Sequence, residues 1–568
     1  MAEMILPGVY IEERAEGLIA PGLISVGNLG VVGTASKGPL WQPVLLGSFQ
    51  QARDTFGDYD QWQGGGQNEL TLVRALELAY NAGANTVFAV RVSSKAGQND
   101  KALAAGYTMA GDGNNKVAAK LAAASPGTWG NKISVNVWDA DQDSVIVNEQ
   151  HDGGAAITLN RHPVAADNPR NRVSVLVAAT GQTRVLAVVT TAPQAGQVKI
   201  AANTGALTFA AGEDPAAGDK VSATYIVPMA NSRKVTLRYL QTTEVYTVAD
   251  GAHLVDQLSD PAGPSALAVG TNGADAATLP KKHNAQDEFR EFGKGTDTAG
   301  SDGADASQGN YKDGFDLLLN EPAHIMVAAG LDNEAIGDEL SAHCDKASTD
   351  EWKHERIGVV GSKVNATLND MLGHTLSDGR MIFAGPGIHA TDAASGQDVV
   401  LPGAYTAAVI AAMLSARSPH ISLTNKSVPV GALEDKFDPT ELKQLVLARV
   451  LAVEERRGLG IRVVKGITTD PGAFTQITTR RIVDYAKYGV RSAAEPYIGL
   501  LNNERVRGAL RATINSFLAE MVEDEMLTKY LLDVTATRSD EIKGICRVTM
   551  TLLPTFSIDY IKVTMYLQ

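Results

Sequence analysis

Cysteine and aromatic side chains are scarce in this chain. Cys344 and Cys546 are the two cysteines among 568 residues, and two such distant thiols exclude a disulfide framework or a zinc knuckle. Aromatic residues make up 6% of the sequence, whereas glycine occurs 55 times. This combination favours many short strands and turns over a large catalytic core. The length predicts two to four domains.

Excess positive charge and long apolar runs are also missing. The formal net charge of -14 argues against a general nucleic-acid binder, which needs a basic face. One long uncharged stretch, residues 399–416, contains Pro402 and Gly403 and is rich in alanine. It is too short and too weakly apolar to cross a bilayer, so we interpret it as a buried core helix. We therefore expect neither membrane insertion nor direct nucleic-acid binding.

Motifs for catalysis and for cofactor or metal binding are not found. The glycines of residues 27–38 match neither the phosphate-binding loop nor the dinucleotide fingerprint, and they indicate tight turns around a buried strand. His343, Cys344 and His354 do not have the spacing of zinc ligands. We expect no enzyme activity, cofactor or metal. The alternative is an α/β enzyme with a β-rich accessory domain, whose ligand would occupy a crevice within residues 330–390.

An α/β pattern begins near residue 27 and is interrupted. Leu72, Leu76 and Ala79 have helical spacing, and this predicted helix lies between two predicted strands. Continuous apolar runs later in the chain are typical of parallel strands buried on both faces: residues 324–330, 356–361 and 380–385. Short β-type runs punctuated by Gly, Pro and Asn separate the two parts. The sequence predicts an α/β domain at 26–95 with 311–430, and a β-rich insertion at 96–310.

The C-terminal third contains the clearest helix signals. Asp438 as N-cap, Pro439 at the first helical position and Glu441 predict a helix that runs to Gly458. A second helix carries one apolar stripe: Val506, Leu510, Ile514, Phe517, Leu518 and Met521. Two strands separated by Pro554 follow. We assign residues 431–554 to a C-terminal domain.

The two ends of the sequence have extended-chain character without a partner. Residues 1–25 are too short to hold a core, and residues 555–568 alternate between apolar and polar side chains. A lone alternating strand is an exposed edge and an aggregation hazard unless another strand pairs with it. We interpret both segments as arms.

The charges of the helix near residue 502 run against its dipole. Three arginines come early, whereas Glu520, Glu523, Asp524 and Glu525 come late. The helix macrodipole prefers the opposite order by about 0.3–1 kcal/mol per well-placed charge. Two interpretations remain open: the arginines dock on an acidic surface outside the helix, or they form salt bridges within their own domain.

Several segments resemble recurring segments of the contractile tail sheath family. They are PGVYIEE at 7–13, GVVGTASKGP at 30–39, SPGTWGNKISVNV at 125–137 and the stretch TTDPGAF to YIG at 468–499. The resemblance covers about 1–95 and 310–568, and it holds for 138–310 only in kind.

The resemblance implies a fold and a function. The fold would be an α/β multidomain protein with an interrupted sheath core, an inserted β-rich outer domain and strand arms at both ends. The subunit would form stacked hexameric rings around an inner tail tube and contract to drive the tube through the target cell envelope, delivering a genome or effectors. Further partners would be baseplate and tail terminator proteins. The location would be the virion, after assembly in the bacterial host cytoplasm.

The resemblance also assigns roles to residues. Arms would add strands to neighbouring subunits by β-augmentation. The N-arm residues are Val9, Tyr10 and Ile11. The C-arm residues are Ile558, Tyr560, Ile561, Val563 and Met565. The receiving strands contain Ile461, Val463 and Lys465, and Ile545, Arg547 and Thr549. The candidates for facing the tube are Arg505, Arg507 and Arg511.

Overall fold

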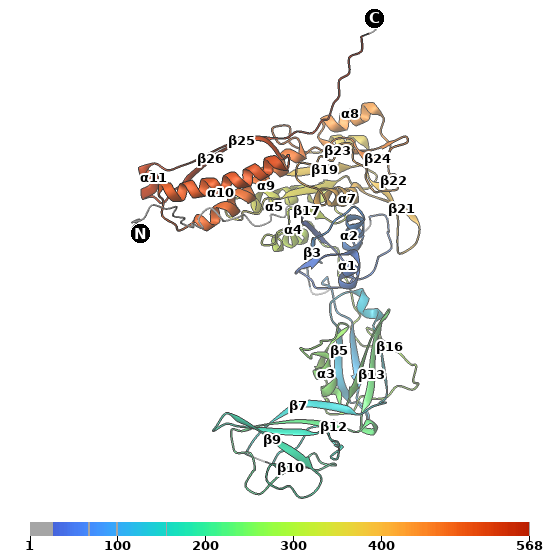
Figure 1. The fold of residues 1–568 in the computed structure, drawn as a ribbon. Helices are drawn as coiled ribbons and strands as arrows, with labels where there is room; N and C mark the ends of the chain where they lie inside the picture. Colours follow the sequence, from blue (N-terminus) through green and yellow to red (C-terminus); the bar gives the residue numbers. More distant parts are fainter. Residues whose placement is uncertain (1–26, 66–68, 98–99, 155, 567–568) are drawn as a thin grey trace, which may run out of the picture. The chain divides into compact units, whose positions relative to one another are not determined.

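The computed structural model describes residues 27–65, 69–97, 100–154 and 156–566 (Figure 1). These residues form two compact units. The α/β unit contains the described residues of 1–35, 40–95 and 305–568, and the insertion unit contains those of 36–39 and 96–304.

The α/β unit is organised around an eight-stranded sheet with the order β2-β3-β1-β17-β18-β19-β23-β24. Six strands from β3 to β23 are parallel, and the edge strands β2 and β24 are antiparallel to their neighbours. The strands are β1 (Leu29–Gly33), β2 (Pro43–Leu46), β3 (Val87–Arg91), β17 (Ile325–Ala328), β18 (Ile357–Gly361), β19 (Met381–Gly385), β23 (Val450–Arg456) and β24 (Gly460–Val463). The apolar runs at 324–330, 356–361 and 380–385 are therefore parallel strands, as predicted.

Helices cover both faces of this sheet. On one face α1 (Phe49–Phe56), α2 (Leu72–Asn81) and α7 (Gly403–Ser415) share a core with Val31 and Val327. On the other face α4 (Gln308–Leu317), α5 (Asn333–Ala347), α6 (Leu368–Leu372) and α8 (Pro439–Leu447) pack on Val32 and Met326. Twelve successive residues of α7, from Gly403 to Leu414, are buried. The uncharged stretch is thus a buried core helix, as expected.

The predicted helix from Pro439 to Gly458 is wrong in its second half. Asp438 and Glu441 form the expected capping box, but α8 ends at Leu447. Arg449 adopts a φ of 67°, and the chain then enters β23 beside β19. The apolar run at 450–453 completes the parallel sheet, and this burial overrides its helical spacing. The expected boundary at 430 therefore divides one sheet, because β23 and β24 lie beyond it.

The insertion unit is built from β-sheets with two separate cores. A six-stranded sheet has the order β11-β10-β9-β8-β12-β7, and the other sheets have the orders β14-β13-β6-β16 and β15-β5-β4. The elements are β4 (Gly106–Ala110), β5 (Val117–Ala123), β6 (Ser134–Asp139), β7 (Ser144–Asp152), β8 (Arg172–Val177), β9 (Gln182–Val189), β10 (Gln197–Ile200), β11 (Leu207–Phe209), β12 (Lys220–Val227), β13 (Arg233–Tyr239), β14 (Thr242–Val248), α3 (Gly251–Leu258), β15 (Ala268–Asn272) and β16 (Arg290–Glu291).

The insertion unit begins and ends at neighbouring points. The amide of Ala304 donates a hydrogen bond to the carbonyl of Asp100 over 2.9 Å. The unit ends at Ala304 rather than near 310, because Ser307 caps α4, which packs on the large sheet.

The C-terminal part of the α/β unit has its own core. Helices α9 (Ile477–Ala494) and α10 (Glu504–Glu523) pack together and against the hairpin of β25 (Leu527–Thr535) and β26 (Arg547–Pro554), whose connection holds α11 (Arg538–Ile542). The predicted stripe of α10 faces this core: Leu510, Ile514, Phe517, Leu518 and Met521 are buried, and Val506 is half-buried. A small sheet of β20 (Ile388–Thr391), β21 (Asp398–Leu401) and β22 (Ala432–Leu433) completes the unit.

Within the described ranges, no helix has both the length and the apolar character that crossing a membrane requires.

Candidate inter-subunit surfaces

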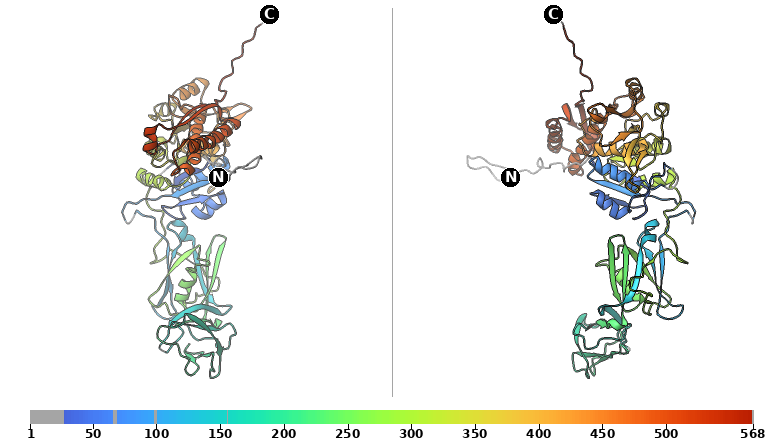
Figure 2. Two further views of the ribbon diagram at one scale, coloured as in Figure 1. Left: turned by 60° about the vertical axis from the view of Figure 1, so that its left-hand side comes forward. Right: turned by 90° about the vertical axis from the view of Figure 1, so that its right-hand side faces the viewer.

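The C-terminal segment leaves the α/β unit as an extended chain (Figures 1 and 2). None of residues 555–566 belongs to a strand or helix. The five predicted C-arm side chains are 73–85% exposed: Ile558, Tyr560, Ile561, Val563 and Met565. Such exposure of alternating apolar side chains suits a strand that pairs with another chain.

The strand β26 offers an open edge. It pairs with β25 and with no other strand in the described part of the chain. Val548, Met550 and Leu552 face the helices, whereas Arg547 and Thr549 are exposed on the other face. Arg547 forms an ion pair with Asp540 at 2.7 Å, and its hydrogen bond lowers the pKa of that carboxyl. Ile545 lies before the strand, and its carbonyl accepts from the Asn502 amide at 2.9 Å.

The edge at Ile461 and Val463 is already occupied, so the prediction that it receives a strand is wrong. The amide of Val463 donates to Lys426, and its carbonyl accepts from Asn425. The carbonyl of Ile461 accepts from the amide of Val428. The other edge of β24 pairs with β23. Both edges are therefore filled by the same chain.

Lys465 follows this edge and binds the C-terminal segment of its own chain. Its Nζ atom lies 3.5 Å from the carboxylate of Asp559 and 3.2 Å from the hydroxyl of Tyr560. No motif in the sequence marks Asp559, because an acidic side chain is one of several polar residues in the alternating segment.

The arginines of α10 do not share one environment. Arg507 is mostly buried, forms an ion pair with Glu541 at 3.1 Å and donates to Asn502 at 2.9 Å. This contact matches the intradomain interpretation for Arg507. Arg511 donates to the carbonyl of Leu532 at 3.3 Å, at the exposed side of the helix. Tube docking by Arg505 and Arg511 stays a prediction.

The N-arm residues Val9, Tyr10 and Ile11 lie outside the described residues.

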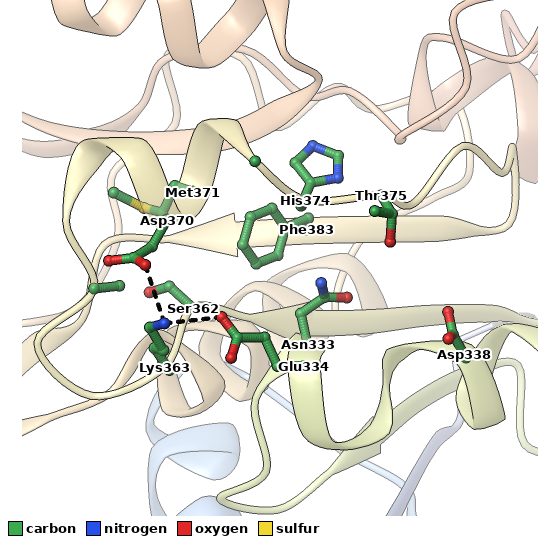
Figure 3. Close-up of a pocket in the computed structure, with 12 residues that line it drawn as sticks. Asn333, Glu334, Asp338, Ser362, Lys363, Asp370, Met371, His374, Thr375 and Phe383 are labelled. Carbon is green, nitrogen blue, oxygen red and sulfur yellow. Dashed lines mark hydrogen bonds and ion pairs between the residues drawn. The ribbon is translucent and has the colours of Figure 1, made fainter.

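A crevice lies at the carboxyl ends of β17 and β18, where the enzyme alternative expects a ligand (Figure 3). Its volume is about 200 Å³. Lys363 bridges Glu334 at 2.9 Å and Asp370 at 3.0 Å, and the hydrogen bonds that it donates to these two carboxylates raise its pKa. The Thr367 hydroxyl and then Lys363 lower the pKa of Asp370 to about 2. Lys363 is thus a protonated structural bridge, which suits neither a general base nor an amine nucleophile.

The residues considered above as zinc ligands make other contacts. Cys344 is fully buried in the core, where burial raises its pKa to about 12, and His343 binds Arg356. The described ranges hold no group of three His, Cys, Asp or Glu side chains that is arranged for a metal ion.

Two sets of known proteins resemble this chain. Residues 469–568 match the model of the phage tail sheath C-terminal domain. A tail sheath protein of Bacillus phage SP01 is 28% identical over 230 residues, which are 39% of this chain and 40% of that protein. A putative tail sheath protein of Enterococcus phage phiEF24C is 26% identical over 277 residues, 47% of each chain. The matched stretches thus span less than half the length of either relative.

Solved structures share the fold. The sheath tail protein of Desulfitobacterium hafniense aligns over 96% of this chain and 100% of its own, with a TM-score of 0.55 and 12% identity. The sheath tail protein of Listeria innocua aligns over 95% and 98%, with a TM-score of 0.56 and 12% identity. The predicted resemblance to contractile tail sheath proteins is confirmed by these relatives and by the match of residues 469–568 to the phage tail sheath C-terminal domain.

Proposed function

We propose that this chain is a structural subunit that polymerises as stacked hexameric rings around an inner tube and contracts to drive that tube through a target cell envelope. The observation that carries the proposal is the content of the matched domain. It holds the α9–α10 pair, the open hairpin and the exposed C-terminal segment. Its open edge and its unpaired apolar segment are complementary elements of one chain.

Subunits connect by strand exchange in this proposal. The segment from Ile561 to Met565 adds to the open edge of β26 on a neighbouring subunit, near Arg547 and Thr549. Main-chain hydrogen bonds supply affinity, and the alternating side chains fix the register. The N-arm with Val9, Tyr10 and Ile11 adds to a neighbour in the same way.

The linked arms keep subunits together while their bodies rotate and slide. Contraction then needs no fuel when it is triggered, because the extended sheath is a trapped state. The subunits move to a packing that buries more surface, and the energy was stored at assembly as a difference between two sets of interfaces.

Further partners follow from this role. The inner tube contacts the subunit through Arg505 and Arg511. Baseplate and tail terminator proteins lie at the two ends of the polymer. The subunit belongs to the virion of a phage, whose genome passes through the tube, and it assembles in the bacterial host cytoplasm. Glutamate at Arg505 and Arg511 should weaken binding to purified tube protein, and unchanged binding would contradict this contact.

Deletion of residues 561–568 tests strand exchange. The truncated subunit should remain folded, because Ile561, Val563 and Met565 are more than 70% exposed in the subunit. It should fail to form cylinders in negative-stain microscopy and should sediment as a monomer. A matched control changes the two polar residues Lys562 and Thr564 to Ser, which leaves the apolar alternation intact and should leave polymerisation normal. Cylinders of normal length from the truncated protein would refute the proposal.

A further inference from the structure

The side chain of Asp559 is largely shielded from solvent in a segment that is mostly exposed. Its side chain is 10% exposed, whereas its neighbours Ile558 and Tyr560 are 81% and 80% exposed. From Tyr560 to Tyr566 every described residue is exposed. An ionised carboxylate leaves water only where other polar groups replace its hydration, so something in the fold holds Asp559.

Three side chains of the α/β unit surround this carboxylate. The hydroxyl of Thr424 and the amide of Gln476 each lie 3.4 Å from one of its two oxygens. The ammonium of Lys465 lies 3.5 Å away and is itself only 21% exposed. These residues come from the segment before α8, the residues after β24 and the start of α9. The site is therefore formed by the folded unit and not by the segment itself.

Residues 555–560 contact their own subunit at both ends. The amide of Thr555 donates to the carbonyl of Met526 over 3.1 Å, which extends the hairpin by one bond. Ser557 then bonds to Asp559 at 3.1 Å, and Lys465 lies 5.2 Å from the centre of the Tyr560 ring. Residues 555–560 thus have contacts to their own subunit that Ile561 and its successors do not share in the described structure.

We propose that Thr424, Lys465 and Gln476 form an arm clamp that holds Asp559 on its own subunit. Tyr560 is then the pivot of the arm, and residues from Ile561 onward are the part that crosses to a neighbour. The meaning of the clamp as a pivot rests on the proposed function, but the contact itself does not. The clamp fixes the point on each subunit from which the crossing part of the arm starts. The six extended residues 561–566 reach roughly 20 Å from Tyr560.

Holding residues 555–560 on their own subunit also favours assembly. An arm that is free from residue 555 samples more positions than one that begins at residue 561, and it loses more conformational entropy when it pairs. Clamping part of the arm before binding removes that part of the cost. It also fixes the direction in which Ile561 leaves the subunit.

Proteolysis of the full-length monomer tests the clamp. Trypsin cleaves after Lys562, three residues beyond Asp559. It binds several residues on each side of the cleaved bond in an extended form, so Asp559 and Tyr560 must leave the clamp before cleavage. When opening is fast, cleavage follows the population of the released segment. Asp559→Ala should raise the rate of cleavage after Lys562 about fivefold, the upper end of the effect expected for the loss of a partly exposed ion pair. Asp533→Ala removes an exposed acid on β25 and should leave that rate unchanged.

A double-mutant cycle identifies the clamp residues. Lys465→Met should accelerate the same cleavage, and the two substitutions together should accelerate it by less than the product of their single effects, because both remove the contact between Lys465 and Asp559. Lys465→Met also removes the contact with Tyr560, so the double variant should still be somewhat faster than Asp559→Ala. Equal cleavage rates for Asp559→Ala and the natural chain would overturn the clamp and leave strand exchange standing. Normal polymerisation after deletion of 561–568 would overturn strand exchange and leave the clamp standing.

Discussion

At the scale of single residues, Arg356 is a buried charge with several hydrogen-bond acceptors around it. Its guanidinium donates to the carbonyls of Leu318, Leu319 and Glu321 at 3.0–3.3 Å and to Nε2 of His343 at 2.9 Å. Since Nε2 accepts, His343 is neutral with its proton on Nδ1. Burial, followed by the charge of Arg356, lowers the pKa of His343 to about 3. The pair ties α5 to the chain between α4 and β17.

This lowered pKa predicts a pH dependence. The unfolded histidine binds a proton near pH 6.5 and the folded one near pH 3, so the folded state loses stability as pH falls below 6.5. From pH 7 to pH 5 this group should cost about 2 kcal/mol. His343→Gln keeps an acceptor for Arg356 but does not titrate, so its urea unfolding should lose about 2 kcal/mol less over that interval. An equal loss in both proteins would contradict the assignment.

The partners of Arg356 illustrate what the sequence could not supply. His343 and Cys344 were considered as possible zinc ligands from the sequence, and their spacing argued against a zinc site. Besides His343, the acceptors of Arg356 are backbone carbonyls more than 30 residues away, which no side-chain motif encodes. The same holds for Asp559, whose partners are 83–135 residues distant.

At the scale of elements, the ring of Phe517 on α10 packs directly against Gly489 on α9. A Cβ atom at this position would lie 1.8 Å from Cζ of Phe517. Gly489→Ala should therefore destabilise the C-terminal domain by about 1–3 kcal/mol, because the ring must move within a packed core.

Gly508 provides a matched control within the same helix pair. A Cβ atom there meets nothing within 4 Å, so Gly508→Ala should stabilise α10 by about 0.8–1 kcal/mol. Thermal unfolding of both variants measures the difference. A Gly489→Ala protein as stable as the natural chain would show that the helices are packed less closely than described.

Elements with strong local signals were predictable from the sequence. The capping box at Asp438, the buried parallel strands and the α10 stripe all correspond to structure. The error at residues 448–458 arose because an apolar run of strand length also fits helical spacing. Its place beside β19, far away in sequence, decided the outcome. The closure of β24 by residues 425–428 is another long-range event that local patterns do not contain.

At the scale of the whole molecule, the insertion unit should be removable. Its ends meet where Ala304 bonds to Asp100, so a short Gly-Ser link can join residues 100 and 304. The remaining α/β unit keeps its own cores and should fold. The protein without the insertion should show one cooperative unfolding transition. It should still polymerise, because the arms and β26 are unchanged. Loss of cooperative unfolding would show that the two units depend on each other.

The closed edge of β24 has a consequence for the subunit before assembly. A polymer-forming protein must reach a high concentration without joining neighbours at the wrong place, and the margin of a large sheet is where amyloid-like pairing begins. Residues 425–428 cover this margin with the chain's own backbone. Pairing of this edge with another chain is thereby prevented, and in the proposed function strand pairing between subunits is confined to the hairpin of β25 and β26.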